Sequence, residues 1–326
     1  ANHDKWNVNG ATGQSLDFKL RQAESNRMNI TVNPNGSADF KTITEAISSI
    51  PAPNSRRVVV FIAPGLYREK IVIPVTLPFI TFLGDTINRP KITGSDKSST
   101  IGSDGRPLGT INTATVAVNA DYFIAINIIF ENTVSPLPGS NNDQAVAFRT
   151  SGNKSAFYNC AFYGFQDTLY DHEGFHYFKE CYIRGFVDFV FGNGRSLYES
   201  CTLESIAQNL GYITAQSCRN LETKTGFSIT KSRIIGSGQV YLGRPWDKFS
   251  TVIYSYTYME NIIVPQGWDG TMNQDYHLTA YYGEYQCSGP GSNLAARPPW
   301  VHRMTDQEVQ PFIGIHYIEG ETWLIM

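Results

Sequence analysis

The chain has 326 residues, a formal net charge of −3 and a pI near 6.1. Charged residues make up 17 % of it, below the roughly 25 % of an average soluble domain. No cluster of lysine and arginine occurs, and the longest apolar run, VVVFIA at residues 58–63, is far shorter than a membrane-spanning helix. The composition therefore argues against nucleic-acid binding and membrane insertion, while 28 glycines and 37 tyrosines and phenylalanines (18 and 19) favour β structure with many turns.

The N-terminal region carries weak indications of export. The chain begins ANHDKW without a secretory signal, as a processed protein would. Acceptor tripeptides for N-glycosylation occur at Asn29, Asn35 and Asn153. Such tripeptides also arise by chance, so they favour a secreted, extracellular glycoprotein only slightly.

Two helices are expected before the first strand-like segments. Residues 15–27 form a possible helix, and Phe40, Ile43, Ile47 and Ile50 share one face of a second, which Pro51 ends. Thr42 and Glu45 have the spacing of a capping box. No flexible linker divides the chain, so we expect one domain over residues 1–326, with an N-terminal extension (1–29) and a C-terminal tail (about 280–326) packing on it.

Short strands dominate from Val58 to about Thr279, and they repeat. YNCAF (158–162), KECYI (179–183) and ESCTL (199–203) place Cys160, Cys181 and Cys201 at steps of 21 and 20 residues. Ile128 and Ser232 extend the column at longer intervals. A second column begins at Gln144, Asp167, Asp188, Gly211 and Gln239, with steps of 23, 21, 23 and 28.

Two columns with one shared, irregular period predict an all-β parallel solenoid, in which equivalent positions stack about 4.8 Å apart. An antiparallel sandwich would need tight hairpins, and a doubly wound α/β fold would need helices in the gaps. The five cysteines do not form a small disulfide framework, and we expect the stacked ones to be buried free thiols.

Stacking would bring two acids together. Asp167 in GFQDTLYD and Asp188 in GFVDFVFG stand at matching points of successive coils, with Gln144 on the same line and Gln166 beside it. An isolated Asp near glycine usually caps a turn, but two acids and two amides on one line favour a site. Like charges at that range should split the two pKa values, giving one acid and one base or nucleophile.

Arg244, in YLGRPW, could hold one Asp ionised through a bidentate pair. Tyr241, Trp246 and Trp268 could stack on sugar rings, although core packing is about as common for such residues. The pattern thus suggests a polysaccharide cleft. It leaves open whether the reaction is glycoside hydrolysis by a carboxylate pair or ester hydrolysis with an Asp nucleophile.

A competing motif is HEGFH at residues 172–176, which matches the H-E-x-x-H pattern of zinc proteases. That chemistry needs a helix, whereas Gly174 lies in the middle and strand-like segments flank it. We interpret the motif as a loop between two coils. The sequence shows neither a histidine-dependent triad nor a G-x-S-x-G elbow.

Several motifs in order resemble the pectin methylesterases (pectinesterases) of plant cell walls, across roughly residues 30–325. They are GLYREK (65–70), QAVAFR (144–149), GFQDTLY (164–170), DFVFG (188–192), GYITAQ (211–216) and LGRPW (242–246). The resemblance implies a right-handed parallel β-helix and a carboxylic ester hydrolase that acts on the C6 methyl esters of pectin.

The resemblance also implies roles for individual residues. Asp188 would be the nucleophile, Asp167 the general acid and then base, and Gln144 and Gln166 the donors to the oxyanion. Arg244 would orient Asp188, keep it ionised with a lowered pKa, and contact substrate. The sugar cleft would be lined by Thr110, Phe191, Tyr241, Trp246 and Trp268.

The family scheme requires no metal and no organic cofactor. The implied partners are pectin, which is methyl-esterified homogalacturonan, and a proteinaceous pectinesterase inhibitor. We expect a monomer that binds neither nucleic acid nor membranes, and nothing in the sequence suggests an inactive homologue. A pectin-directed glycosidase or lyase on the same scaffold, or a non-catalytic cell-wall-binding protein, is the alternative.

Overall fold

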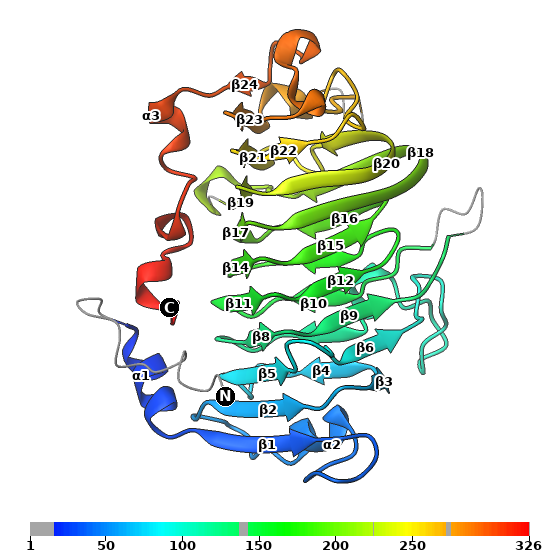
Figure 1. The fold of residues 1–326 in the computed structure, drawn as a ribbon, viewed down its shortest axis with the longest axis vertical. Coiled ribbons are helices and arrows are strands. Elements are labelled where there is room, and N and C mark those ends of the chain that lie inside the picture. The colour runs from blue at the N-terminus through cyan, green and yellow to red at the C-terminus, as the bar shows by residue number, and fades with distance from the viewer. Residues whose placement is uncertain (1–15, 137–142, 224, 272–274, 326) are drawn as a thin grey trace.

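A computed structural model describes residues 16–136, 143–223, 225–271 and 275–325 (Figure 1). Within these ranges no helix is both long and apolar enough to cross a membrane. The chain winds into stacked coils whose neighbouring strands all pair in parallel, as the repeat predicts. The N-terminal coils lie at the bottom of Figure 1 and the C-terminal coils at the top.

Most coils contain three strands, one more than the two columns found in the sequence. The first strand of each coil joins a sheet with the order β1 (Met28–Val32), β2 (Val58–Ile62), β5 (Ile80–Gly84), β8 (Ile124–Ile126), β11 (Ser155–Tyr158), β14 (Phe175–Lys179), β17 (Arg195–Glu199), β19 (Gly226–Thr230), β21 (Thr251–Ser255), β23 (Tyr281–Tyr285) and β24 (His302–Arg303).

The other strands form two further columns that long strands join into one sheet. The first column holds β3 (Leu66–Arg68), β6 (Lys91–Gly94), β9 (Ile129–Asn132), β12 (Ala161–Tyr163) and β15 (Tyr182–Gly185). The second holds β4 (Ile71–Ile73), β7 (Val116–Val118), β10 (Phe148–Thr150), β13 (Leu169–Asp171) and β16 (Val187–Gly192). The long β18 (Thr202–Gln216) pairs with both β15 and β16, and β20 (Arg233–Gly243) pairs with β18 and β22 (Tyr258–Met259).

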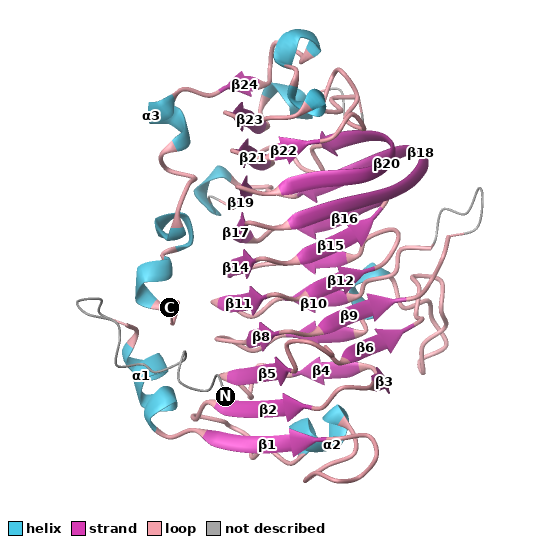
Figure 2. Cartoon of the chain, viewed as in Figure 1, coloured by secondary structure: helices cyan, strands magenta, loops and turns pink. Residues whose placement is uncertain are grey.

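The helices are short and lie outside the coils (Figure 2). They comprise α1 (Phe18–Ser25), α2 (Ile43–Ser48) and α3 (Asp306–Val309), with 3₁₀ turns η3 (Thr110–Asn112), η4 (Leu221–Thr223), η5 (Tyr276–Leu278), η6 (Pro290–Ser292), η7 (Leu294–Ala296), η8 (Ile315–Ile318) and η9 (Gly320–Thr322). Both bonds of the predicted capping box are present: Thr42 Oγ1 accepts from the Glu45 N–H, and Glu45 accepts from the Thr42 N–H.

The cysteine column has the predicted register. Ala161 pairs with Tyr182 and Tyr182 with Thr202, so Cys160, Cys181 and Cys201 occupy equivalent interior positions, each at most 1 % exposed. All five cysteines are free thiols, and burial raises the pKa of the Cys160 thiol to about 12. These side chains are therefore small, inert core residues.

The turn before each cysteine position explains how the coils stay in register. Asn159, Glu180 and Ser200 all adopt positive φ (48°, 54° and 56°), a conformation that few non-glycine residues adopt. Each N–H donates to a carbonyl of the next coil, for example Asn159 to Lys179 and Glu180 to Glu199, both at 3.0 Å. The same tight turn thus recurs, and its backbone donors are satisfied between coils.

Aromatic side chains stack inside the solenoid along the same axis. Phe157, Phe178 and Tyr198 lie in register, with ring centroids 4.6 and 4.5 Å apart and interplanar angles of 6° and 3°. Each is fully buried. Stacked rings of this kind contribute about 0.5–1.5 kcal/mol per pair beyond the area they bury.

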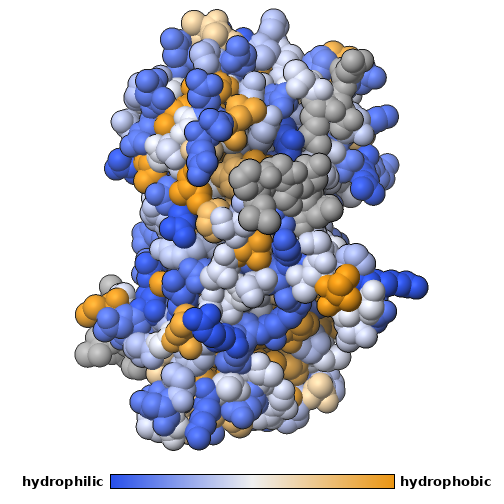
Figure 3. Space-filling view, turned by 90° about the vertical axis from the view of Figure 1, so that its right-hand side faces the viewer, coloured by the Kyte–Doolittle hydropathy of each residue, from blue (hydrophilic) through white to orange (hydrophobic). Residues whose placement is uncertain are grey.

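Two expectations need correction. Phe148 pairs with Leu169, a step of 21, so Val146 rather than Gln144 is in register with Asp167. Strands also continue past Thr279 as β23 and β24. The residues that follow return along the first sheet, where Tyr317 and Ile318 pack against Leu197 in a second apolar cluster. On the face drawn in Figure 3, hydrophobic side chains lie in separate patches among hydrophilic ones.

Candidate active site

The two acids predicted from the repeat lie on adjacent coils. Leu169 pairs with Val190, which puts Asp167 and Asp188 at the same level of β13 and β16. Both have positive φ, 63° and 50°, and both are nearly buried, 8 % and 4 % exposed. The Asp167 N–H donates to the Val187 carbonyl at 3.0 Å. Two non-glycine residues in this uncommon conformation at one level show that both coils make the same constrained turn at the acids.

Arg244 completes the group from two coils further along, directly after β20. Its Nε donates to Asp188 Oδ1 at 2.8 Å and its Nη2 to Asp188 Oδ2, the predicted bidentate pair. The guanidinium also lies over the rings of Tyr212 and Trp246, 4.4 and 5.4 Å from their centroids. The arginine is therefore held in one orientation by a carboxylate and two aromatic faces.

The two acids titrate differently because Arg244 pairs with Asp188, whereas Asp167 forms no ion pair with a residue that the structure describes. Burial raises the pKa of Asp167 well above its ordinary range, and the charge of Asp188 raises it further. Burial also raises the pKa of Asp188, but the Arg244 pair opposes this increase. The expectation that the pKa of Asp188 falls below its usual value is wrong, because desolvation is the larger effect. Asp188 nevertheless remains the stronger acid, so a single proton of the pair resides on Asp167.

Two side-chain amides lie at the same end of the strands. The Gln166 carbonyl accepts from the Ala145 N–H at 3.2 Å, which brings the backbone next to Gln144 close to Gln166. The Ser98 hydroxyl donates to Gln144 Oε1 at 2.6 Å, which turns the amide NH₂ of Gln144 away from Ser98. Gln144 precedes β10 and Gln166 precedes β13, so the two amides lie on successive coils.

A cleft of about 560 Å³ opens over the acids. Of the predicted residues it is lined by Asp167, Asp188, Thr110, Phe191 and Trp246. Trp246 is 46 % exposed, as a sugar-stacking residue must be. The residues that line the cleft do not include Gln144, Gln166, Arg244 or Tyr241, and the ring of Tyr241 stacks on Tyr212 at 5.3 Å.

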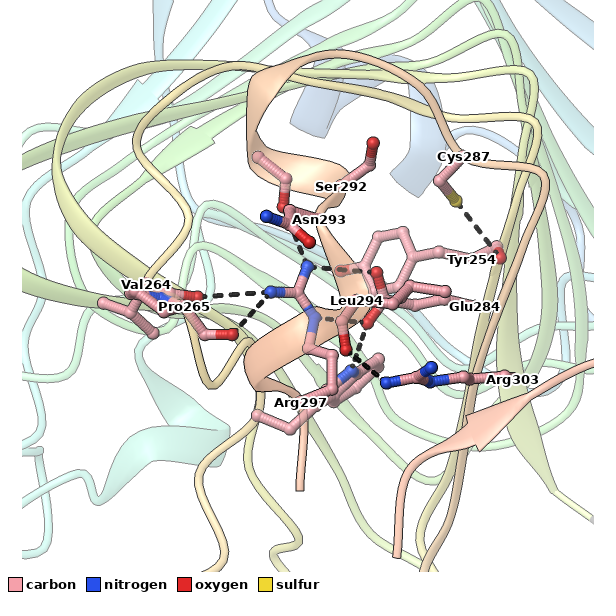
Figure 4. Close-up of polar contacts among 12 residues, drawn as sticks. Tyr254, Val264, Pro265, Glu284, Cys287, Ser292, Asn293, Leu294, Arg297 and Arg303 are labelled. Carbon is pink, nitrogen blue, oxygen red and sulfur yellow. Dashed lines mark hydrogen bonds and ion pairs between the residues drawn. The ribbon is translucent and has the colours of Figure 1, made fainter. Parts of the chain in front are cut away.

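Trp268 does not form a wall of the cleft. Its indole is 1 % exposed, stacks on Tyr282 at 4.4 Å and donates from Nε1 to Glu284 Oε1 at 3.0 Å. Glu284 is held by Arg297, which also bonds the carbonyl of Pro265 (Figure 4). Arg297 bonds the carbonyl of Gly291 as well. Trp268 is thus a core residue at the C-terminal end of the solenoid, and it does not line the cleft as predicted.

The zinc-protease motif has no helix. His176 lies in β14 and is fully buried, with Nδ1 2.5 Å from Asp171 Oδ1 and Nε2 3.0 Å from the Gly152 carbonyl. Over the described residues there is no group of three or more His, Cys, Asp or Glu side chains suited to a metal. The larger groove, about 810 Å³ near Asn127 and Asn159, lies away from the acid pair, so volume alone does not identify the site.

Other residues of the cleft were not predicted from the sequence. They are Ile111, Tyr170, His172, Gly192, Asn193, Ala215, Ser217, Arg219, Asn220 and Thr223. Tyr170 could have been found, because it lies 21 residues before Phe191 and the two rings stack at 4.2 Å. His172 belongs to HEGFH, which we interpreted only as a connecting loop.

Comparisons with known proteins identify the family. A sequence model of the Pectinesterase family matches residues 29–321. The chain belongs to the pectinesterase family. It is 44 % identical to "Pectinesterase QRT1" of Arabidopsis thaliana, over 90 % of this chain and 78 % of the relative. It is 42 % identical to "Probable pectinesterase 50" of the same plant, over 95 % of this chain and 84 % of the relative.

Solved pectinesterases share the fold. Pectin methylesterase from carrot superposes with a TM-score of 0.83 at 34 % identity, covering 91 % of this chain and 95 % of that one. A pectin methylesterase in complex with a hexasaccharide superposes with a TM-score of 0.76 at 27 % identity, covering 91 % and 98 %. The predicted parallel β-helix is confirmed, and the pectinesterase is a carboxylic ester hydrolase.

Proposed function

We propose that this pectinesterase hydrolyses the C6 methyl esters of galacturonosyl units in pectin, releasing methanol and pectate. Family membership and the relatives solved with hexasaccharides support a polysaccharide ester as the substrate. The observation that carries the proposal is the arrangement of Asp188, paired bidentately with Arg244, beside Asp167 in an open cleft, where burial and the charge of Asp188 raise the pKa of Asp167.

In the first half-reaction the Asp188 carboxylate attacks the ester carbonyl carbon. The carbonyl oxygen becomes an oxyanion, and the amide NH₂ groups of Gln144 and Gln166 donate hydrogen bonds to it. One such donor contributes about 2.7–4 kcal/mol of barrier lowering. The carbon–methoxy bond then breaks, the Asp167 proton passes to the methoxy oxygen, and methanol leaves. An acyl group remains bound to Asp188.

In the second half-reaction Asp167 acts as a base. Its carboxylate, now ionised, removes a proton from a water molecule whose oxygen attacks the acyl carbon. The bond to Asp188 breaks and the product carboxyl group is released as an acid, which gives its remaining proton to solvent and becomes the pectate carboxylate. Asp167 is again protonated and Asp188 ionised, with Arg244 stabilising the returning charge. The scheme routes no step through a metal or an organic cofactor.

We also propose that the enzyme is secreted and modifies the cell wall as a monomer subject to a proteinaceous inhibitor. The relatives from Arabidopsis thaliana are pectinesterases, which supports a plant cell-wall setting. Asn29, Asn35 and Asn153 are all exposed, so each acceptor is open to glycosylation during export.

The test is methanol release from highly esterified pectin, measured for the intact chain and for Asp188→Ala. We expect release by the intact chain and a loss of about 10⁴-fold or more in kcat for the variant, because no nucleophile remains. Circular dichroism checks that the variant is folded. No methanol at any pH between about 5 and 9 would contradict the proposal. New reducing ends or unsaturated products without methanol would instead favour a glycosidase or lyase.

A further inference from the structure

His172 is a titratable group in the cleft to which the proposed reaction gives no role. It directly follows β13 and lines the same cleft as the two catalytic acids. Its N–H donates to the Thr150 carbonyl at 3.0 Å and its carbonyl accepts from the Asn193 N–H at 2.9 Å. The backbone of His172 is thereby hydrogen-bonded to the coils on both sides. These bonds fix the position of its Cα at the wall of the cleft, from which the imidazole extends.

One nitrogen of the imidazole is occupied by a short relay. Arg149 Nη1 donates to Ser151 Oγ at 2.7 Å, and Ser151 Oγ lies 2.9 Å from His172 Nδ1. Arginine can only donate, so the hydroxyl accepts from Arg149 and has its own proton available for His172. Accepting that proton at Nδ1 gives the Ser151 hydroxyl both a donor and an acceptor partner, and it requires the neutral ring to carry its hydrogen on Nε2.

The surroundings keep the ring neutral and leave Nε2 available. Burial lowers the pKa of His172, and Arg149 and His176 act in the same direction, whereas Glu173 and Asp171 oppose them. The ring packs edge-on against Tyr170 at 4.9 Å, and the side chain is 28 % exposed. Nε2 makes no hydrogen bond to any residue that the structure describes, although the side chain borders the cleft.

We infer that His172, held as its Nε2–H tautomer by Arg149 and Ser151, donates a hydrogen bond to an acceptor oxygen of a galacturonosyl unit and so contributes to substrate binding. This inference rests on the proposed function. His172 lies five residues beyond Asp167 along the chain, so the contact is made outside the reacting ester and stabilises the bound substrate and the transition state equally. Its loss should therefore raise KM and leave kcat unchanged.

A matched pair of substitutions tests the inference. In His172→Asn the amide can replace only Nδ1, which keeps the bond to Ser151 and removes the donor to substrate. In His172→Gln the longer side chain can place its NH₂ near the position of Nε2. We expect KM for esterified pectin to rise about 3- to 10-fold in His172→Asn, as loss of one neutral hydrogen bond predicts, and to change less in His172→Gln. An unchanged KM in folded His172→Asn would overturn the inference.

The tautomer is measured separately by ¹⁵N NMR of the labelled protein. We expect the Nε2–H pattern for His172, and its weakening in Ser151→Ala with recovery in Ser151→Thr. An Nδ1–H pattern in the intact protein would overturn the inference. The two hypotheses fail in different ways: without any methanol release by the intact chain the proposed function fails, whereas normal turnover with an unaltered KM in His172→Asn refutes only the role of His172.

Discussion

Arg297 with Glu284 and Arg244 with Asp188 form two bidentate pairs in one solenoid, the first at its C-terminal end and the second in the cleft. The Arg297 pair is 2 % and 1 % exposed, and the guanidinium also bonds main-chain carbonyls of Val264, Pro265 and Gly291. The Arg244 pair is 18 % and 5 % exposed, and among the described residues its guanidinium hydrogen-bonds only to Asp188.

The difference shows what makes an ion pair functional. Around Arg297 nearly every donor and acceptor has a partner, so the pair connects loops and has no capacity left for a ligand. Beside Asp188 stands a second carboxylate, Asp167, which forms no ion pair with any described residue and has a raised pKa. Incomplete pairing next to an open cleft, rather than the ion pair itself, marks the reactive centre.

The largest difference between the two ion pairs should appear in the free energy of unfolding of Glu284→Gln. Removing one partner leaves the Arg297 charge buried without compensation and weakens the bond to the Trp268 indole. We expect the free energy of unfolding to fall by about 3–5 kcal/mol. Denaturant titration measures this loss, and kcat of the folded fraction should stay near that of the intact enzyme. A large fall in kcat with unchanged stability would reverse the roles assigned to the two pairs.

A smaller effect, visible as a pH shift, is expected for Arg244→Gln. Arg244 opposes the increase that burial causes in the pKa of Asp188, so without it that pKa rises further. The acidic limb of kcat/KM, which reports ionisation of the nucleophile in the free enzyme, should move to higher pH. Arg244→Lys keeps the positive charge but loses the bidentate geometry. The acidic limb of its kcat/KM profile should therefore lie between those of the intact enzyme and of Arg244→Gln. If the acidic limbs of all three enzymes coincided, Arg244 would have no effect on the pKa of Asp188.

The sequence predicted positions best where one interior side chain must stack on another. The predicted spacing of Cys160, Cys181 and Cys201 matches the register of the structure. It could be predicted because a shift of one coil by a residue would move these side chains out of the core. Gln144 was misplaced by two residues because it precedes β10, outside the column of buried cysteine positions from which the repeat is read most securely. The burial of Trp268 depends on Glu284, sixteen residues later, and nothing in PQGWDG indicates that partner.

The electrostatic balance was the least predictable feature. The repeat placed Asp167 beside Asp188 and the motif LGRPW supplied Arg244, so the members of the group could be named. The direction of the Asp188 pKa depends on how completely the coils exclude water, which residue spacing does not give. Similarly, the position of His172 at the cleft depends on bonds to Thr150 and Asn193 that join three coils.

The smallest effect on stability comes from the ionisation of Asp167 in the cleft. Its pKa is raised in the folded protein above the ordinary value of 3.8, so the folded state binds more protons than the unfolded state as pH rises. The favourable contribution of protonated Asp167 is complete below about pH 3.8 and is lost as pH rises through the folded pKa. Each tenfold difference in proton affinity between the folded and unfolded states corresponds to about 1.4 kcal/mol of stability.

Asp167→Asn removes this pH dependence because an amide cannot ionise. Its melting temperature, relative to the intact enzyme, should therefore increase between about pH 4 and pH 8, while kcat falls about 10²- to 10⁴-fold through loss of the acid. Asp188→Asn is the matched control: it leaves Arg244 without its carboxylate, so its relative melting temperature should lie below that of Asp167→Asn at neutral pH. Differential scanning fluorimetry across this range measures both. A relative melting temperature of Asp167→Asn that does not change with pH would mean that Asp167 is not the proton-holding member of the pair.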